Sequence, residues 1–225
     1  MMARILSLNV GLIGTLRHAG KEVPSAFAKL PVEGALELSS TGLADDRQAD
    51  LKNHGGPDKA VCVFPHEHYQ RLGQMLGRGL EFAAFGENFT TTGLLEAEVC
   101  IGDVYTIGSA VVQVSQPRQP CFKMGARHRE PQLPLWVQES GLTGFYLRVL
   151  QAGVVRAGEE FVLKLRGRIS VLEANRVMHR DRTDFDTIRE LLSEPTLSAS
   201  WQRSLGRRLE GVLENTAPRL RGSES

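Results

Sequence analysis

The sequence has few cysteines, almost no net charge and no long apolar run, and each shortage excludes a class of protein. Its 225 residues include three cysteines without paired spacing, which argues against a disulfide framework and fits a reducing compartment. The net charge of +1 gives no overall reason to bind nucleic acid or an acidic membrane surface. No stretch approaches bilayer length, and residues 1–10 lack the apolar core and cleavage site of a secretory signal. We therefore expect a cytoplasmic protein without a membrane partner.

The sequence also lacks the common nucleotide and metal signatures. It has no Walker phosphate loop, no dinucleotide fingerprint and no cysteine cluster that could hold an iron–sulfur centre. Cys62, His66 and His68 are zinc-ligand types. If residues 65–76 form a helix, however, His66 and His68 point to nearly opposite sides and cannot share one ion.

Short β-type runs separated by glycine fill residues 1 to about 165, which predicts a mainly β (α+β) domain built as a barrel or a strongly bent sheet. Gly108-Ser109 reads as the turn of a tight hairpin. Two helices interrupt the strands, one from Pro65 to Leu76 and one from Leu133 to Ser140. The expected strands are 4–10, 104–107, 110–114 and 161–165.

From Ile169 onward the pattern becomes helical, so we divide the chain into a barrel domain, 1–165, and a small three-helix domain, 166–225. The helices are expected to start at Ser170, at Asp184 and at Ser198 or Ser200, the last running to Leu213. Residues after about Ala217 are expected to form a loose tail. Three short helices resemble a helix-turn-helix, but the small surplus of arginine over acidic residues favours a plain bundle and makes a nucleic-acid partner unlikely.

Cys121 has the most informative surroundings in the chain. It lies between Arg118 and Lys123, and nearby cations favour the thiolate, which is the form that attacks or binds metals. A lone cysteine is more often a small buried hydrophobe, and the two flanking cations are what separate Cys121 from that interpretation. Cys62 and Cys100 lie in short apolar runs and read as core strand positions.

Residues 53–59, with the sequence NHGGPDK, form a second group. Adjacent glycines let backbone amides approach a ligand closely, and Lys59 stands where it could meet an anion. The simpler interpretation is a turn between strands. With His54 before the glycines and Lys59 after them, anion binding is the interpretation we favour.

Two further loops carry polar side chains. In residues 86–92, Glu87 and Asn88 could contact the edge of a heterocycle, but on this segment alone a plain polar turn is the favoured interpretation. In residues 41–50, Asp46 or Asp50 could handle protons or orient His54, whereas a charge-rich loop is usually solvated surface.

Taken in order, residues 42–59, 85–88, 100–103 and 116–123 resemble the MOSC family, domains related to the C-terminal part of molybdenum cofactor sulfurases. The resemblance runs through about residues 3–165 and is greatest to the bacterial branch that protects against 6-N-hydroxylaminopurine. The helical tail is similar to the three-helix domain of that branch. The resemblance implies a MOSC-type β-barrel with a few helices, followed by that small domain.

The resemblance also implies a cofactor, molybdenum held by a pyranopterin dithiolene. By this analogy Cys121 is the metal ligand, because a soft thiolate suits a metal already bound by sulfur. The cofactor-binding residues predicted on the same basis are Lys59, Arg118, Lys123, Asn53, His54, Glu87 and Asn88.

The activity implied is reduction of small N-hydroxylated substrates to amines, with Cys121, His54 and Asp46 as the catalytic residues. The electrons would come from a separate flavoprotein, since the sequence shows no flavin or iron–sulfur signature. A homodimer is possible. The alternatives are a cofactor carrier or sulfur-handling module using Cys121, a metal-free thiol enzyme using Cys121 with His54, and the disfavoured nucleic-acid binder.

Overall fold

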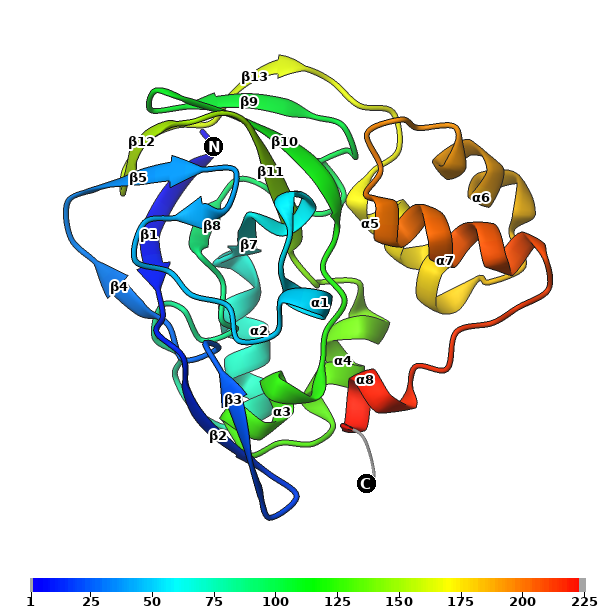
Figure 1. Cartoon of the computed structure of the whole chain (residues 1–225), viewed down its shortest axis with the longest axis horizontal. Coiled ribbons are helices and arrows are strands. Elements are labelled where there is room, and N and C mark those ends of the chain that lie inside the picture. The colour runs from blue at the N-terminus through cyan, green and yellow to red at the C-terminus, as the bar shows by residue number, and fades with distance from the viewer. Residues whose placement is uncertain (1, 223–225) are drawn as a thin grey trace.

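The computed structural model describes residues 2–222 and shows a curled mixed sheet with a cluster of helices at one side (Figure 1). The large sheet has the strand order β13-β9-β10-β11-β7-β8-β1-β4, in which β7 and β8 are parallel and the other neighbours antiparallel. Its strands are β1 (Arg4–Val10), β4 (Leu30–Val32), β7 (Val61–Pro65), β8 (Phe89–Thr92), β9 (Val104–Ile107), β10 (Ala110–Pro117), β11 (Phe145–Gln151) and β13 (Val162–Leu165).

Smaller strand groups complete the β part. The strands β12 (Gly153–Arg156), β5 (Ala35–Ser39) and β6 (Gly42–Leu43) form one sheet, and β2 (Gly14–His18) pairs with β3 (Lys21–Ser25) in a hairpin. The predicted hairpin at Gly108-Ser109 is confirmed, because Ala110 pairs with Ile107. The strand predicted at residues 4–10 is confirmed as β1.

The large sheet curls until its first strand meets the segment that leads into β13. Ile5 donates its amide to the carbonyl of Glu159 over 3.0 Å, and Phe161 donates to the carbonyl of Ala3 over 2.9 Å. These bonds satisfy backbone groups that a sheet edge would expose. The result is the mainly β, barrel-like fold predicted from the sequence.

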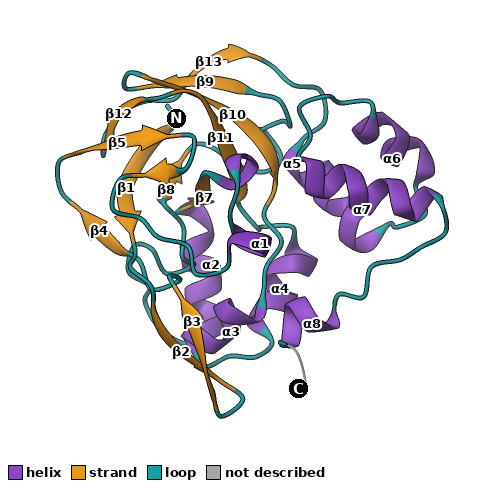
Figure 2. Cartoon of the chain, in the orientation of Figure 1, coloured by secondary structure: helices purple, strands orange, loops and turns teal. Residues whose placement is uncertain are grey.

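The core of this half-barrel is made by the inward side chains of the curled sheet. Strand β7 is buried along its whole length, as expected for a central strand covered on both faces. A second apolar cluster lies below the sheet, where α2 (Glu67–Leu76), α3 (Phe122–His128) and α4 (Leu133–Ser140) fill one opening (Figure 2). The first cluster includes Ile5, Val63, Phe89, Val112, Val114 and Phe145, and the second includes Phe64, Tyr69, Leu72, Phe85 and Met124.

The helix predicted from Pro65 starts two residues later, at Glu67. Pro65 is instead the last residue of β7, where it pairs with Thr91, and its chain direction is set by the sheet. Helix α4 has the predicted bounds and ends at Gly141, which takes a left-handed conformation with φ of 75°.

The helical part contains α5 (Val171–Asn175), which continues as a π-helix over Arg176–Arg180, then α6 (Phe185–Leu192) and α7 (Ala199–Leu209). The predicted starts at Ser170, Asp184 and Ser198 are confirmed, since each side chain accepts a hydrogen bond from the amide three residues on. Helix α7 ends four residues before the predicted Leu213. Gly211 adopts φ of 80° and the amide of Val212 bonds to the carbonyl of Arg207, which stops the helix.

The prediction of a loose tail after Ala217 was wrong within the described residues. Ala217–Arg221 form a short helix, α8, which docks beside α3 (Figure 1). Arg219 anchors it through two hydrogen bonds to the barrel domain. The part of the predicted tail at residues 223–225 lies outside the described residues. Within residues 2–222, no helix combines the length and the apolar character needed to span a membrane.

Candidate functional site

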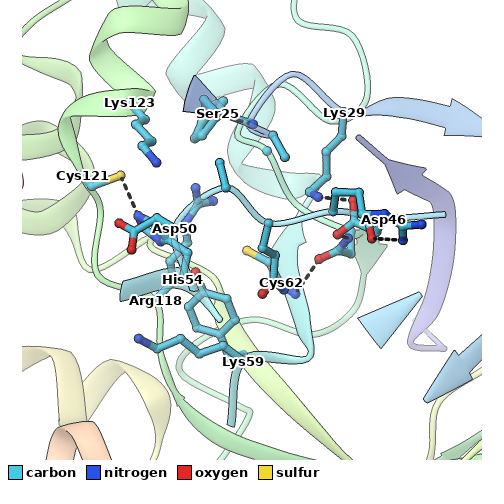
Figure 3. Close-up of a pocket in the computed structure, with 18 residues that line it drawn as sticks. Ser25, Lys29, Asp46, Asp50, His54, Lys59, Cys62, Arg118, Cys121 and Lys123 are labelled. Carbon is cyan, nitrogen blue, oxygen red and sulfur yellow. Dashed lines mark hydrogen bonds and ion pairs between the residues drawn. The ribbon is translucent and has the colours of Figure 1, made fainter. Parts of the chain in front are cut away.

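A pocket opens between the end of β3 with the loop that follows it, the segment 46–59 and the start of α3 (Figure 3). It brings together residues that are far apart in the sequence. Of the predicted site residues it is lined by Asp46, His54, Lys59, Asn88, Arg118, Cys121 and Lys123.

Cys121 sits at the entrance to α3, where its extended backbone ends the loop before the first helical turn. Its side chain points into the pocket, and its Sγ lies 3.8 Å from Nε2 of His54 (Figure 3). The residue is only 6% exposed. The structure thus places the predicted thiol and the predicted imidazole within sulfur hydrogen-bond distance, although 67 residues separate them.

His54 is the last residue of the short helix α1 (Leu51–His54). Burial, followed by the nearby positive charge of Lys123, lowers the pKa of His54 to about 4. The imidazole is therefore neutral at neutral pH, and one ring nitrogen is free to accept a proton.

Asp50 is the carboxylate nearest to His54. It begins α1 as the N-cap and accepts hydrogen bonds from the amide of Asn53 (3.0 Å) and from its Nδ2 (2.9 Å). Burial alone would raise the pKa of Asp50, but these hydrogen bonds, with His54 and Lys123 nearby, hold it below its usual value. Asp50 is ionised at neutral pH and fixes the helix that carries His54.

Asp46 lines the same pocket but has a different set of partners. It forms a buried ion pair with Lys29, accepts the amide of Gly11 over 2.8 Å, and accepts Nδ2 of Asn88 over 2.9 Å. These contacts tie the loop to the barrel. Of the two carboxylates considered from the sequence, Asp50 rather than Asp46 lies beside His54, and the catalytic role predicted for Asp46 stays a prediction.

The three cations predicted from the sequence all line the pocket, together with Lys29 and Arg47. Lys59 donates to the carbonyl of Asn53 over 2.7 Å, and burial lowers the pKa of Lys59. Lys123 is 8% exposed, on the first turn of α3. Arg118 is 5% exposed; its Nη2 donates to the carbonyl of Phe85 over 2.6 Å, while its buried Nη1 has no hydrogen-bond partner in the part of the chain described.

No carboxylate pairs with Arg118 among residues 2–222. Its guanidinium lies 5.7 Å from the ring centre of Phe27, a cation–π arrangement that compensates only part of the cost of burial. A buried cation without an acidic partner is expensive in a folded protein. The pocket is therefore built to receive a negatively charged group.

Two predicted contacts serve the scaffold instead. Glu87 is fully buried outside the pocket lining, where it accepts hydrogen bonds from the hydroxyl of Tyr69, the amide of Phe85 and the hydroxyl of Thr90. Burial and this carboxylate raise the pKa of Tyr69, so the phenol stays protonated and donates. The side chain of Asn53 binds Asp50, and only its carbonyl reaches Lys59.

Asn88 lines the pocket, but its amide group is occupied by the protein. Its Oδ1 accepts the amide of Cys62 over 3.1 Å, and its Nδ2 donates to Asp46 and to the carbonyl of Asn9. The side chain therefore joins β7, β1 and the 46–50 loop. Both hydrogens of Nδ2 are used, so a ligand can be added without breaking these bonds only at the second lone pair of Oδ1.

Several lining residues had no signal in the sequence. Ser25 is the last residue of β3, Phe27 and Lys29 lie in the loop that follows, and Tyr146 comes from β11. Cys62 was interpreted as a core strand position; it does lie in β7, but it also lines the pocket. Because β7 is buried along its whole length, its apolar run hides which positions face a cavity.

Comparison with known proteins gives two family matches. Residues 50–162 match the family described as "MOSC domain", and residues 169–211 match the family described as "YiiM-like, 3-alpha helix domain". The first match ends at the start of β13 and the second begins just before α5, where the strands give way to helices.

Individual proteins that are similar to this chain agree with these family matches. The chain is 47% identical over 211 residues to "Uncharacterized protein YflK" of Bacillus subtilis (strain 168), covering 93% of this chain and 96% of that protein. The crystal structure of YiiM from Geobacillus stearothermophilus superposes with a TM-score of 0.79 at 37% identity, covering 92% of this chain and 99% of that one. A protein named "Reductase" from Gibberella moniliformis (strain M3125 / FGSC 7600) is 33% identical over 78% of this chain but only 32% of its own length.

Proposed function

The chain belongs to the MOSC domain family, and from that premise we propose that it is a molybdenum cofactor-dependent reductase that converts N-hydroxylated compounds, such as 6-N-hydroxylaminopurine, to amines. The name "Reductase" of the fungal relative supports an oxidoreductase assignment. The observation that carries the proposal is the juxtaposition of the Cys121 thiol with a neutral His54 in a pocket whose lining includes Lys59, Arg118 and Lys123.

The donor set of the pocket fits this cofactor. The unpartnered Nη1 of Arg118, with Lys59 and Lys123, supplies positive charge for the anionic phosphate of a pyranopterin. Cys121 supplies the soft thiolate that suits a metal already held by sulfur. These four residues are the ones we expect to hold it, and the bound cofactor would supply a redox centre able to take up the N–O oxygen of a substrate.

The reaction requires protons as well as electrons. Converting an N-hydroxylamine to an amine breaks one N–O bond, consumes two electrons and two protons, and releases water. His54 is the group placed to move protons, because its imidazole is neutral and adjacent to the site. If Cys121 were to hold the metal as the thiolate, His54 would be the group placed to accept the thiol proton, because its imidazole is neutral and its Nε2 lies 3.8 Å from Sγ.

The electrons would come from a separate protein, for which we propose a flavoprotein. The three cysteines of this chain lie at positions 62, 100 and 121 and all are buried, so they do not make the clustered ligand set of an iron–sulfur relay. A partner that reduces the site must therefore approach the pocket from outside.

The test compares Cys121→Ser with wild type, using Cys100→Ser as a matched control because Cys100 is a buried thiol outside the pocket. Each protein is produced in a host that makes the cofactor, and molybdenum is measured by elemental mass spectrometry. Reduction of 6-N-hydroxylaminopurine is then assayed with a chemical reductant. We expect near-stoichiometric metal and turnover in wild type and control, and loss of turnover with weakened metal retention in Cys121→Ser.

Two results would reject the proposal. Metal-free wild-type protein, from a host whose other molybdoenzymes are loaded, would rule out the cofactor. Bound cofactor without turnover under any reductant, together with transfer of that cofactor to an apo-enzyme, would identify a carrier that uses the same cysteine.

A further inference from the structure

The chain returns from the helical part to the barrel through residues 212–222, which we call the C-terminal strap. It leaves the end of α7 and terminates in α8, which packs against α3 and lies next to α4 (Figure 1). Residues 169–211 account for the three-helix family match, so the strap is additional to both family matches.

Arg219 is the contact between the strap and the loop that carries Cys121. Its Nη1 donates to the carbonyl of Pro120 over 2.5 Å, and its Nη2 donates to Oε1 of Gln138 on α4 over 2.8 Å. Gln138 is itself 5% exposed, so its side chain is a fixed acceptor. The guanidinium fork thus bridges α4 to the residue immediately before Cys121.

The carbonyl of Pro120 is the backbone group through which Arg219 restrains the loop that carries Cys121. A peptide unit is planar, so the direction of the Pro120 carbonyl fixes the direction of the Cys121 amide and the axis about which Cys121 turns into α3. Proline has no N–H, so hydrogen bonds can fix this residue only through its carbonyl. A bond to that carbonyl therefore restrains the backbone from which the Cys121 side chain projects.

The strap also meets the residue after Cys121. The ring of His18 packs on the ring of Phe122 with centroids 4.6 Å apart, and its Nε2 donates to the carbonyl of Arg221 over 2.7 Å. Gly222 fits against this pair, since a Cβ there would come within 2.6 Å of His18. Pro120 and Phe122 are thus both restrained from the strap, one on each side of the reactive residue.

Charge gives Arg219 a second link to the site. Burial lowers the pKa of Arg219, while the negative charge of Glu214, followed by the nearby Cys121, acts in the opposite direction. The Nε of Arg219 is buried without a hydrogen-bond partner among residues 2–222. The side chain thus leaves part of its hydrogen-bonding capacity unused.

We propose that Arg219 is a positioning residue for Cys121, which holds the Pro120–Cys121 peptide against Gln138 and so keeps the thiol aimed at His54. The inference rests on the proposed role of Cys121 as the reactive residue. It assigns the C-terminal strap to the assembly of the site rather than to a loose end of the chain.

The test uses three full-length variants. Arg219→Met keeps the aliphatic stem and removes every donor, and Arg219→Lys keeps one donor and the charge. Arg221→Met is the matched control, because Arg221 is an exposed residue of the same helix that contacts His18 only through its backbone carbonyl. Each protein is made without cofactor, so that Cys121 is a free thiol in every sample.

Two measurements report on the cysteine segment. One is the rate of iodoacetamide alkylation at Cys121, with the modified peptide identified by mass. The other is amide hydrogen exchange of peptides covering residues 117–124. Loss of charge-assisted hydrogen bonds in Arg219→Met should raise both the alkylation rate of Cys121 and the amide exchange rate of residues 117–124 by about tenfold or more. Arg219→Lys should restore most of the protection, and Arg221→Met should match wild type.

The proposal is overturned if Arg219→Met and Arg221→Met behave alike, since the guanidinium would then have no role. It is equally overturned if exchange rises uniformly over the barrel, or if Arg219→Lys is no better than Arg219→Met, because either result would indicate general destabilisation. Neither readout depends on molybdenum, so a protein that bound no metal would reject the proposed function and leave this test intact.

Discussion

The carboxylate of Asp58 accepts the backbone amide of Ala199 over 3.1 Å, and this bond ties the barrel to the first turn of α7. The other oxygen of Asp58 accepts Nε of Arg148 on β11 over 3.1 Å. A negative charge at the start of a helix is favourable, because the first amides are unpaired and carry partial positive charge. Since Asp58 precedes Lys59, the helical part is joined to the turn that carries a pocket cation.

The first prediction concerns this joint. Asp58→Ala removes the acceptor from Arg148 and from Ala199, and should lower the free energy of unfolding by about 1–3 kcal/mol, measured by urea denaturation. Asp186→Ala is the control, since the Asp186 side chain is 98% exposed in its ion pair with Arg189 and should change stability by less than about 0.5 kcal/mol. Equal losses in the two variants would show that the joint carries no special stability.

The second prediction concerns Arg118. Arg118→Met removes the buried guanidinium whose Nη1 lacks a partner, and should reduce retention of the molybdenum cofactor by about tenfold or more. Arg127→Met changes an exposed arginine of α3 and should leave retention unaltered. The measurement is the molybdenum content of each variant after gel filtration, determined by elemental mass spectrometry. Full retention in Arg118→Met would remove Arg118 from the binding site.

The third prediction is a pH dependence of stability. The pKa of His54 is about 4 in the folded chain, below the ordinary value of 6.5 that applies after unfolding. The unfolded chain therefore binds a proton first, so stability present above about pH 6.5 falls progressively as the pH drops towards 4. The loss from His54 is at most about 3 kcal/mol.

His179 acts in the same direction, because burial, followed by the charge of Arg219, lowers its pKa to about 3. His54→Gln should flatten the decline without abolishing it, as followed by urea unfolding at pH 7, 6, 5 and 4. An unchanged slope in that variant would show that His54 is not held neutral by the fold.

The fourth prediction contrasts two glycines. Gly144 has φ of 70°, and a Cβ there would lie 2.2 Å from the carbonyl oxygen of Val63, so Gly144→Ala should lose at least about 2 kcal/mol. Gly206 lies in α7 with nothing within 4 Å of an added Cβ, so Gly206→Ala should gain about 0.5–1 kcal/mol. Thermal unfolding of the two single variants measures whether each substitution lowers or raises the stability. A stable Gly144→Ala would mean that the turn before β11 can move.

Local signals in the sequence predicted local structure well. The side chains of Ser170, Asp184 and Ser198 cap the helices that they were expected to start, because capping involves an amide only three residues away. The hairpin at Gly108-Ser109 likewise depends on adjacent residues.

The surroundings of other side chains could not be predicted, because they depend on contacts between segments that are distant in the sequence. Glu87 was predicted to contact the cofactor on the basis of the family resemblance, but the fold turns it towards Tyr69 and Thr90. Lys29 lines the pocket because β1 and the 46–50 loop meet across it, and nothing around residue 29 signals this. Whether a carboxylate such as Asp46 or Asp50 faces His54 depends on a one-turn helix whose position is set by tertiary packing.

Pro120 and Arg219 are 99 residues apart in the sequence, so the strap is synthesised well after the segment that it restrains. At a synthesis rate of about 5–20 residues per second, the cysteine segment emerges roughly 5–20 s before the arginine that restrains it. During that interval a nascent chain carries the Cys121 loop without its bond to Arg219. Ribosome-bound chains that stop before α8 should accordingly present a reactive thiol, which translation of the last helix then withdraws.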